Sequence, residues 1–204
     1  MGKDAEILPP QSPSFCCRDP EPNVKALTSY LKQQKEWVTL GRQGKPALEG
    51  YLREVCSKES FSGSVVVDAN DPWIDELIEL LPAGPERLFL YADMSALVEF
   101  YAGLSGTAKV RVCFALGTPD ETEHVLEGNR DHWMACCYAG SKTEWSCDEL
   151  RARQARGLES LPGDLLLATR DDLTGKVLEF DSTNFPARAD GASQRLVMRI
   201  RMER

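Results

Sequence analysis

Two histidines and a pair of adjacent cysteines carry most of this chain's capacity for metal or nucleophilic chemistry. His124 follows an acidic run that starts at Asp120, and Glu127 comes three residues later. An imidazole beside carboxylates can bind a divalent metal ion, so His124 with Glu123 or Glu127 is one candidate site. The same pattern is also typical of a solvated acidic loop with an exposed histidine. That second interpretation is the more common case for charges in loops.

The cysteines do not have the spacing of a zinc site. Cys136, Cys137 and Cys147 lack the C-x2-C unit, and strand alternation would place the two adjacent thiols on opposite faces of a sheet. A nucleophilic pair of Cys136 or Cys137 with His132 stays open, but nothing in the pattern favours it. The sequence contains no glycine-rich phosphate loop, G-x-S-x-G elbow or H-E-x-x-H motif.

The overall charge argues against two classes of partner. The chain of 204 residues has 24 basic and 32 acidic side chains, for a net charge of −8. Such a surface repels nucleic-acid phosphates and anionic membranes, so we expect neither as a partner. No apolar segment approaches a membrane span, and the seven cysteines form no regular disulfide framework. We therefore expect a cytoplasmic protein with mostly reduced thiols, and the oligomeric state stays open.

The elements that must position these residues change in type near the middle of the chain. Five prolines within residues 1–22 predict an extended arm. Helical spacing then predicts helices over 23–31, 47–57 and 70–81 and a further helix that begins at Asp93. Short strands are predicted at 64–68 and 87–91. Alternating and apolar runs predict the remaining strands, over 109–114, 133–138, 164–169, 176–180 and 194–200.

This order predicts an α+β fold. Residues 23–204 form one domain, with a helical half over 23–105 and a β half over 107–204. His124 falls in the predicted loop between two strands. The predicted interior side chains that face the sheet are Trp73, Leu77, Ile78, Phe100 and Leu104.

One segment resembles a known family. Tyr138-Ala-Gly-Ser-Lys-Thr-Glu-Trp145 is similar to the Tyr-x-Gly-Pro-Gly-Thr-Glu-Trp signature of a mainly bacterial family, the domain-of-unknown-function family eighteen twenty-six. The segment from Leu90 to Gly106, the strand Val110-Arg-Val and the closing Gln194–Ile200 are similar to the same family. The resemblance spans most of the chain, and its most specific part is Tyr138–Trp145.

The resemblance implies a fold and a chemistry. Members typically carry His-x-Asp before the signature and a histidine near the end, which is similar to iron/2-oxoglutarate dioxygenases on a cupin-like double-stranded β-helix, or jelly roll. It implies an iron(II) site at His124 with Glu127 or Asp181, and 2-oxoglutarate bound by Arg195. The chain departs from the pattern at two places. Leu126 stands where the carboxylate is expected, and no histidine lies near Asp181.

Two hypotheses of different classes follow. In the first, the chain is a divergent metal-dependent oxygenase that uses Fe(II) and 2-oxoglutarate on an unknown substrate. In the second, it is a non-catalytic cupin-like module without these cofactors, which binds a small molecule or a protein and has a link to metal homeostasis. The two differ in geometry, because an oxygenase needs His124, an acidic side chain and Arg195 to converge on one cavity. A binding module allows His124 to point into solvent.

Overall fold

The fold is described from a computed structural model, which describes residues 37–42, 46–126, 132–146, 158–160, 164–168, 174–180 and 193–203. The predicted arm over residues 1–22, the helix over 23–31, Glu127 and Asp181 lie outside these ranges. Within them, the helices are α2 (Pro46–Cys56), α3 (Asp75–Ile78), α4 (Pro85–Ser105) and α5 (Pro119–Leu126). None of the described helices is long and apolar enough to cross a lipid bilayer.

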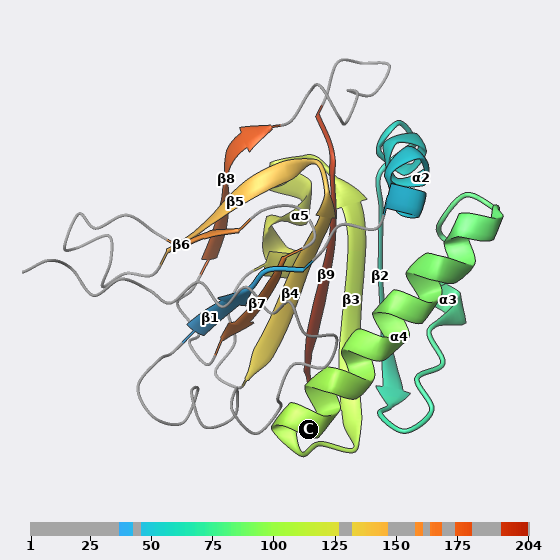
Figure 1. Cartoon of the computed structure of the whole chain (residues 1–204), viewed down its shortest axis with the longest axis vertical. Coiled ribbons are helices and arrows are strands. Elements are labelled where there is room, and N and C mark those ends of the chain that lie inside the picture. Colours follow the sequence, from blue (N-terminus) through green and yellow to red (C-terminus); the bar gives the residue numbers. More distant parts are fainter. Residues whose placement is uncertain are drawn as a thin grey trace, which may run out of the picture.

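The strands form two antiparallel sheets (Figure 1). The six-stranded sheet has the order β1-β7-β4-β9-β3-β2, and the three-stranded sheet has the order β6-β5-β8. The mixed α+β prediction is therefore confirmed at this level. The strands are β1 (Trp37–Leu40), β2 (Phe61–Asp68), β3 (Lys109–Gly117), β4 (Trp133–Ala139), β5 (Ser141–Ser146), β6 (Leu158–Ser160), β7 (Leu165–Ala168), β8 (Thr174–Phe180) and β9 (Arg195–Met202).

The two faces of the six-stranded sheet have different compositions. The face that packs on α2 and α4, here called the α4 face, carries large aliphatic and aromatic side chains such as Phe114, Met198 and Ile200. The opposite face, here called the α5 face, carries smaller side chains, Ala115, Ala135, Cys137, Ala168 and Val197, together with the larger Trp133 and Leu166. Alternation along each strand separates the two sets, and it places Cys136 and Cys137 on opposite faces as predicted.

The region from residue 70 to 105 differs from its prediction. Residues 87–91 and the segment from Asp93 form one continuous helix, α4, which begins with Pro85 and ends at Gly106 in the left-handed conformation. The apolar run Leu88–Tyr91 is typical of a strand, but no turn residue separates it from the helix that follows, so the proline at the start governs the whole segment. Asp93 is consequently not a cap. It lies buried in the middle of the helix.

Burial confirms two of the five predicted core residues fully. Leu77 and Ile78 are buried, and Phe100 and Leu104 are partly buried against the same core. Trp73 was wrongly placed, because its side chain is 67% exposed. A tight turn from Asp68 to Asp71 delays the helix, so α3 begins only at Asp75 and Trp73 lies before it.

The predicted division into a helical and a β half needs two corrections. β1 and β2 come from the first half and form the two edges of the six-stranded sheet. The predicted buried strand at 64–68 is part of β2, whose edge position leaves Val66 40% exposed. In the second half, the predicted acidic loop around His124 is the helix α5.

Candidate functional site

Arg195 begins β9 on the α5 face and is the most buried arginine of the described chain, with 2% exposure. Its Nε donates a hydrogen bond to Thr122 Oγ1 at 2.6 Å, and its Nη2 donates to the carbonyl oxygen of Pro119 at 3.0 Å. Both acceptors are neutral. Its Nη1 is buried and has no hydrogen-bond partner among the described residues. The guanidinium is therefore held in place from one side and keeps an unsatisfied donor on the other.

Helix α5 positions the acceptors of Arg195. Thr118 and Glu121 form a capping box, in which the Thr118 amide donates to Glu121 Oε2 at 2.7 Å and the Glu121 amide donates to Thr118 Oγ1 at 3.4 Å. Pro119 occupies the first helical position, where a missing amide proton costs nothing. The signal Thr-Pro-Asp-Glu was present in the sequence and could have identified the helix. The helix contacts β3 and β9 of one sheet and β8 of the other.

The positive charge of Arg195 is compensated only weakly by negative groups of the described chain. Burial lowers the pKa of the guanidinium, against the opposing fields of Cys137, Glu123 and Asp120. No described carboxylate forms an ion pair with it. A buried donor that lacks an acceptor loses its hydration without a replacement, which makes such groups rare in native folds unless a ligand or water completes them.

A second unsatisfied polar group lies on the neighbouring sheet. Thr143 on β5 is fully buried, and its Oγ1 has no hydrogen-bond partner among the described residues. The chain reaches β5 from β4 through Gly140, which has a φ of 102°. A Cβ atom at Gly140 would lie 2.2 Å from the Gln194 carbonyl oxygen and 2.8 Å from the Arg195 Cα. The connection between the sheets therefore presses against the backbone of Arg195, three residues before Thr143.

The structure places His124 apart from Arg195. The His124 side chain is exposed on α5, whereas Thr122 on the same helix is buried against Arg195. Leu126, at the expected carboxylate position, is fully buried in the apolar cluster of the α5 face. Because Glu127 and Asp181 lie outside the described ranges, the metal site at His124 stays a prediction.

The residues that the structure does describe do not fit an iron ion. Within those ranges, no three histidine, cysteine or acidic side chains lie close enough together to hold a metal ion. The carboxylate end of 2-oxoglutarate is a different case, since the free Nη1 of Arg195 matches it chemically. The described residues thus fit one of the two groups that the family resemblance implies.

A second buried polar cluster lies on the α4 face, and no pattern in the sequence predicts it. Arg42 Nη1 donates to Asp93 Oδ1 and Oδ2 at 3.1 and 2.9 Å, and the Tyr138 hydroxyl donates to Asp93 Oδ2 at 2.9 Å. Arg42 Nη2 lies 3.3 Å from Cys136 Sγ, and its guanidinium carbon is 5.7 Å from the centre of the Tyr138 ring. No spacing rule links residues 42, 93 and 138, so only the fold could reveal this cluster.

The surroundings of Cys136 make it a poor nucleophile. Burial raises the pKa of its thiol to about 12, although Arg42 works in the opposite direction. A nucleophilic cysteine needs the thiolate at neutral pH, and here the thiol keeps its proton. His132 is exposed at the start of β4, and the described contact of its carbonyl is with the Tyr101 hydroxyl. The cluster is best explained as a structural ion pair that attaches the segment after β1 to α4.

Comparisons with known proteins identify a family and a set of similar folds. The family model described as "Protein of unknown function (DUF1826)" matches residues 21–171. No curated protein matches the chain at a significant level. A solved structure of a bsmA homolog from Methylobium petroleophilum is similar, with 13% identity, a TM-score of 0.44 and coverage of 87% of this chain and 91% of that chain.

Two further solved structures are similar at the same level. An Fe(II)/α-ketoglutarate-dependent dioxygenase, TqaL, has 14% identity and a TM-score of 0.43, with coverage of 87% of this chain and 84% of that chain. A Pseudomonas putida prolyl-4-hydroxylase has 14% identity and a TM-score of 0.40, with coverage of 89% of this chain and all of that chain. Likeness at these scores carries no statement about the chemistry of this chain.

Proposed function

Since the chain belongs to the family described as "Protein of unknown function (DUF1826)", its function has to be argued from its own residues, and we propose that it binds a small carboxylate at Arg195. The ligand class is that of 2-oxoglutarate and related dicarboxylates. The observation that carries this proposal is the buried Nη1 of Arg195, which has no partner among the described residues. In this proposal the two sheets form a cupin-like double-stranded β-helix, and the ligand lies on its α5 face.

The geometry of the guanidinium explains the preference for a carboxylate. Thr122 and Pro119 fix the Nε and one proton of Nη2, which leaves Nη1 and the second proton of Nη2 along one edge of the fork. A carboxylate can accept two parallel hydrogen bonds from such an edge. Each charge-assisted bond of this kind contributes about 1.5–3 kcal/mol, enough to offset the burial of the unpaired donor.

Thr143 supports the same location for the ligand. Its buried hydroxyl can donate to or accept from a ligand oxygen, and it lies three residues beyond the Gly140 connection that touches the Arg195 backbone. The α5 face carries small side chains such as Ala115 and Ala135 beside the larger Trp133 and Leu166. An arginine from one sheet and a hydroxyl from the other would then hold the ligand.

A metal-dependent oxygenase is the second candidate. The observation that favours it is the place of Arg195 at the start of the last strand, where the family resemblance expects the arginine that binds 2-oxoglutarate. Iron(II) would supply the activation of oxygen in such a reaction. Its ligands would have to come from His124 with Glu127 or Asp181, and the described residues alone do not bring such a set together.

Isothermal titration calorimetry of the full chain with 2-oxoglutarate, succinate and inorganic phosphate tests the first candidate, carboxylate binding at Arg195. We expect the dicarboxylates to bind, and Arg195→Lys to weaken them by at least about tenfold, because a lysine cannot present a planar fork. The matched control is Arg53→Lys, which changes an exposed arginine on α2. Equal affinity in wild type and Arg195→Lys would refute the assignment, and a preference for phosphate would change the ligand class.

Metal content by mass spectrometry after anaerobic loading with iron(II) separates the two candidates. Near-stoichiometric iron in the wild type that is lost in His124→Ala would support the oxygenase and justify a 2-oxoglutarate turnover assay. If neither protein retains iron while Arg195 still binds the dicarboxylate, the oxygenase is refuted and the binding module stands.

A further inference from the structure

One corner of the α5 face is open to solvent and rich in cationic side chains. It lies where the end of β9 pairs with the start of β3, and β2 borders it. Ser64 and Val66 of β2 point to the same face and are exposed, so a ligand can reach the corner from this side. The cationic side chains of this corner, here called the arginine corner, are Lys109 and Arg111 on β3 and Arg199 and Arg201 on β9.

Two of these arginines lie directly opposite each other. The register pairs Arg111 with Arg201, and strand alternation places both side chains on the α5 face with Ala115 and Val197. Like charges at directly opposed positions destabilise a sheet, and an anion that contacts both would remove this cost. Arg199 lies two residues before Arg201 on the same face, which is about 7 Å along the strand.

The described chain supplies this corner with two carboxylates. Glu203 accepts hydrogen bonds from Arg111 Nε at 2.9 Å and Nη2 at 2.8 Å, so both of its oxygens are used. These bonds lower the pKa of Glu203, and the field of Arg201 lowers it further. Asp68 on β2 lies opposite Lys109. The Nε of Arg201 is buried and has no hydrogen-bond partner among the described residues, so a donor of the corner is left for a further anion.

We propose that the arginine corner binds a phosphate group, with Arg199 and Arg201 as its main donors. A phosphate group carries close to two negative charges at neutral pH and has three acceptor oxygens. Two guanidinium groups about 7 Å apart on one strand, with a third across the sheet, suit such a tetrahedral dianion better than a planar carboxylate. Arg199 is 8% exposed and forms the inner side of the site, whereas the partly exposed Arg201 lies at its rim.

The arginine corner is separate from the carboxylate site at Arg195. Six residues of β9 separate Arg195 from Arg201, which is about 20 Å along the strand. Arg195 offers one edge of a single guanidinium, and a planar carboxylate matches that edge. The corner combines several cations and therefore matches a group of higher charge. The two ends of β9 would bind two different anionic groups, and each can be tested without the other.

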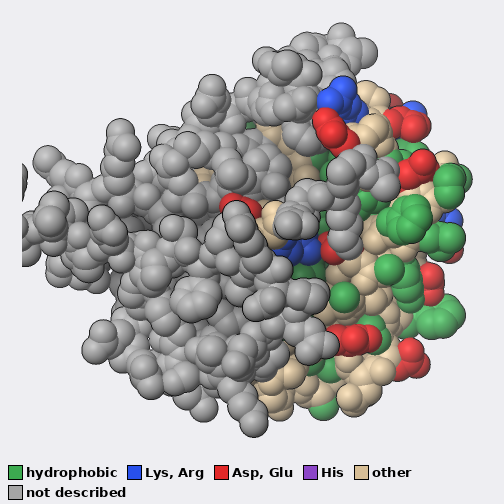
Figure 2. Space-filling model, viewed as in Figure 1, with side chains coloured by type: hydrophobic (Ala, Val, Ile, Leu, Met, Phe, Trp, Pro, Cys, Tyr) green, Lys and Arg blue, Asp and Glu red, His purple; other side chains and the backbone are tan. Residues whose placement is uncertain are grey.

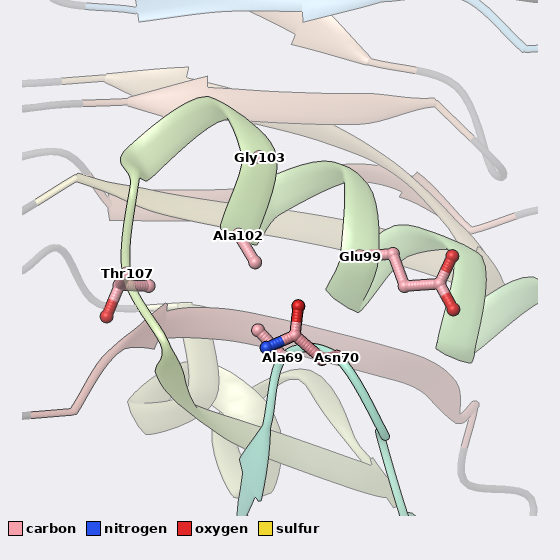
Figure 3. A pocket seen from close by; sticks show the side chains of 6 residues that line it. All are labelled: Ala69, Asn70, Glu99, Ala102, Gly103 and Thr107. Atoms are coloured by element: carbon pink, nitrogen blue, oxygen red, sulfur yellow. The ribbon is translucent and has the colours of Figure 1, made fainter.

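The opposite side of the molecule does not suit a phosphate group. Figure 2 shows Asp and Glu side chains spread over the side that α4 crosses in Figure 1, with few Lys or Arg among them. A cavity of about 390 Å³ lies there, between the end of α4 and the turn after β2 (Figure 3). Its charged lining residue is Glu99, whose field repels an anion. The other lining residues are Ala69, Asn70, Ala102, Gly103 and Thr107.

Isothermal titration calorimetry of the full chain with inorganic phosphate, O-phosphoserine and succinate tests the arginine corner. We expect both phosphates to bind the wild type and Arg201→Gln to weaken them at least about tenfold, because the variant loses a charge-assisted donor. Arg195→Lys should weaken succinate and leave the phosphates unchanged, so a phosphate bound here is not mistaken for a ligand of Arg195. The controls are Arg53→Gln at an exposed arginine on α2 and Glu99→Gln at the cavity.

The two phosphates also distinguish the source of the group. Tighter binding of O-phosphoserine than of inorganic phosphate would assign the corner to an organic phosphate, and equal binding would assign it to free phosphate. A wild type that binds neither would overturn the proposal. Equal affinity in the wild type and in Arg201→Gln would overturn it as well, because the phosphate would then lie elsewhere.

Thermal unfolding gives a second measurement of the same site. Saturating phosphate should raise the Tm of the wild type and of Arg53→Gln and leave that of Arg201→Gln unchanged, because a ligand stabilises only the folded state that binds it. Without phosphate, Arg201→Gln should melt no lower than the wild type, since it removes one of two opposed cations. A lower Tm without phosphate would mean that the chain itself supplies an anion to Arg201, and the proposal would be wrong.

Discussion

Arg42 and Arg195 lie against opposite faces of the same sheet, and they differ in the groups that accept their hydrogen bonds. Arg42 donates to both carboxylate oxygens of the buried Asp93. Arg195 donates to a hydroxyl and a carbonyl group, and one of its nitrogens has no partner among the described residues. A buried charge is tolerated when a charge of opposite sign compensates it. The α4 face therefore holds a complete structural pair, whereas no described anion pairs with Arg195 on the α5 face.

The largest loss of stability should come from Gly140→Ala, which alters the α5 face without changing either arginine. The new Cβ would collide with the Gln194 carbonyl and the Arg195 backbone, and the φ of 102° strains any residue with a side chain. We expect a loss of at least about 3 kcal/mol in the free energy of unfolding by urea.

The control for this variant is Gly50→Ala on α2, where a Cβ meets nothing within 4 Å. Alanine in a helix interior should raise the stability by about 0.5–1 kcal/mol there. If Gly140→Ala were as stable as wild type, the close approach of the β4–β5 connection to Arg195 would be incorrect.

Arg42→Met should have the next largest effect, on the α4 face. It removes the cation and leaves the Asp93 carboxylate buried, with the Tyr138 hydroxyl as its other described donor. Breaking one side of a buried pair costs about 3 kcal/mol or more. Urea unfolding measures the loss. The double variant Arg42→Met/Asp93→Leu should recover most of it, and a failure to recover would show that the two residues do not act as a pair.

Two buried thiols on the α4 face should make the free energy of unfolding depend on pH in the alkaline range. Burial raises the pKa of Cys136 from its ordinary value of 9.0 to about 12, and burial raises that of Cys56 to about 12 as well. The folded thiols keep their protons while the unfolded thiols lose them, so the stabilisation is complete below pH 9 and is lost between pH 9 and 12. The loss can reach about 1.4 kcal/mol per pH unit for each thiol.

Urea unfolding at several pH values checks this dependence. Cys136→Ala and Cys56→Ala should each flatten the curve between pH 9 and 12, and neither should flatten it below pH 8. A curve with the same slope in both variants as in wild type would contradict the role of the buried thiols.

Local patterns located β2, β3, β4, β7, β8 and β9 but not β1, β5 or β6, and they did not show the partners of the charged residues. The runs Lys109–Phe114 and Gln194–Ile200 predicted the positions of β3 and β9, although these strands continue to Gly117 and Met202. The helix α4 was divided wrongly, since its apolar residues surround it on all sides and the period of 3.6 is lost. A missed capping box made α5 a predicted loop.

The candidate site could be predicted only in part. Arg195 was expected at the ligand from the family resemblance, and its unsatisfied nitrogen supports that role. Thr122, Thr143 and Asp93 were not expected, because their partners lie far away in sequence and no periodic pattern relates them. Burial of a polar group is a property of the folded chain, so a sequence alone cannot show which hydroxyl or carboxylate lies next to which arginine.

The smallest change in stability should come from Arg195→Met, and this is the sharpest test of the comparison between the two arginines. The substitution removes a buried charge and leaves only a hydroxyl and a carbonyl acceptor without a donor, so no carboxylate is stranded. Replacing an uncompensated buried ion by an apolar side chain is often neutral or stabilising, and we expect a change within about 1 kcal/mol of wild type by urea unfolding. Added 2-oxoglutarate should then stabilise the wild type and leave Arg195→Met unchanged, because a ligand stabilises only the folded state that binds it. A loss of more than about 3 kcal/mol without ligand would mean that the protein already supplies an anion to Arg195, and the difference between the two faces would disappear.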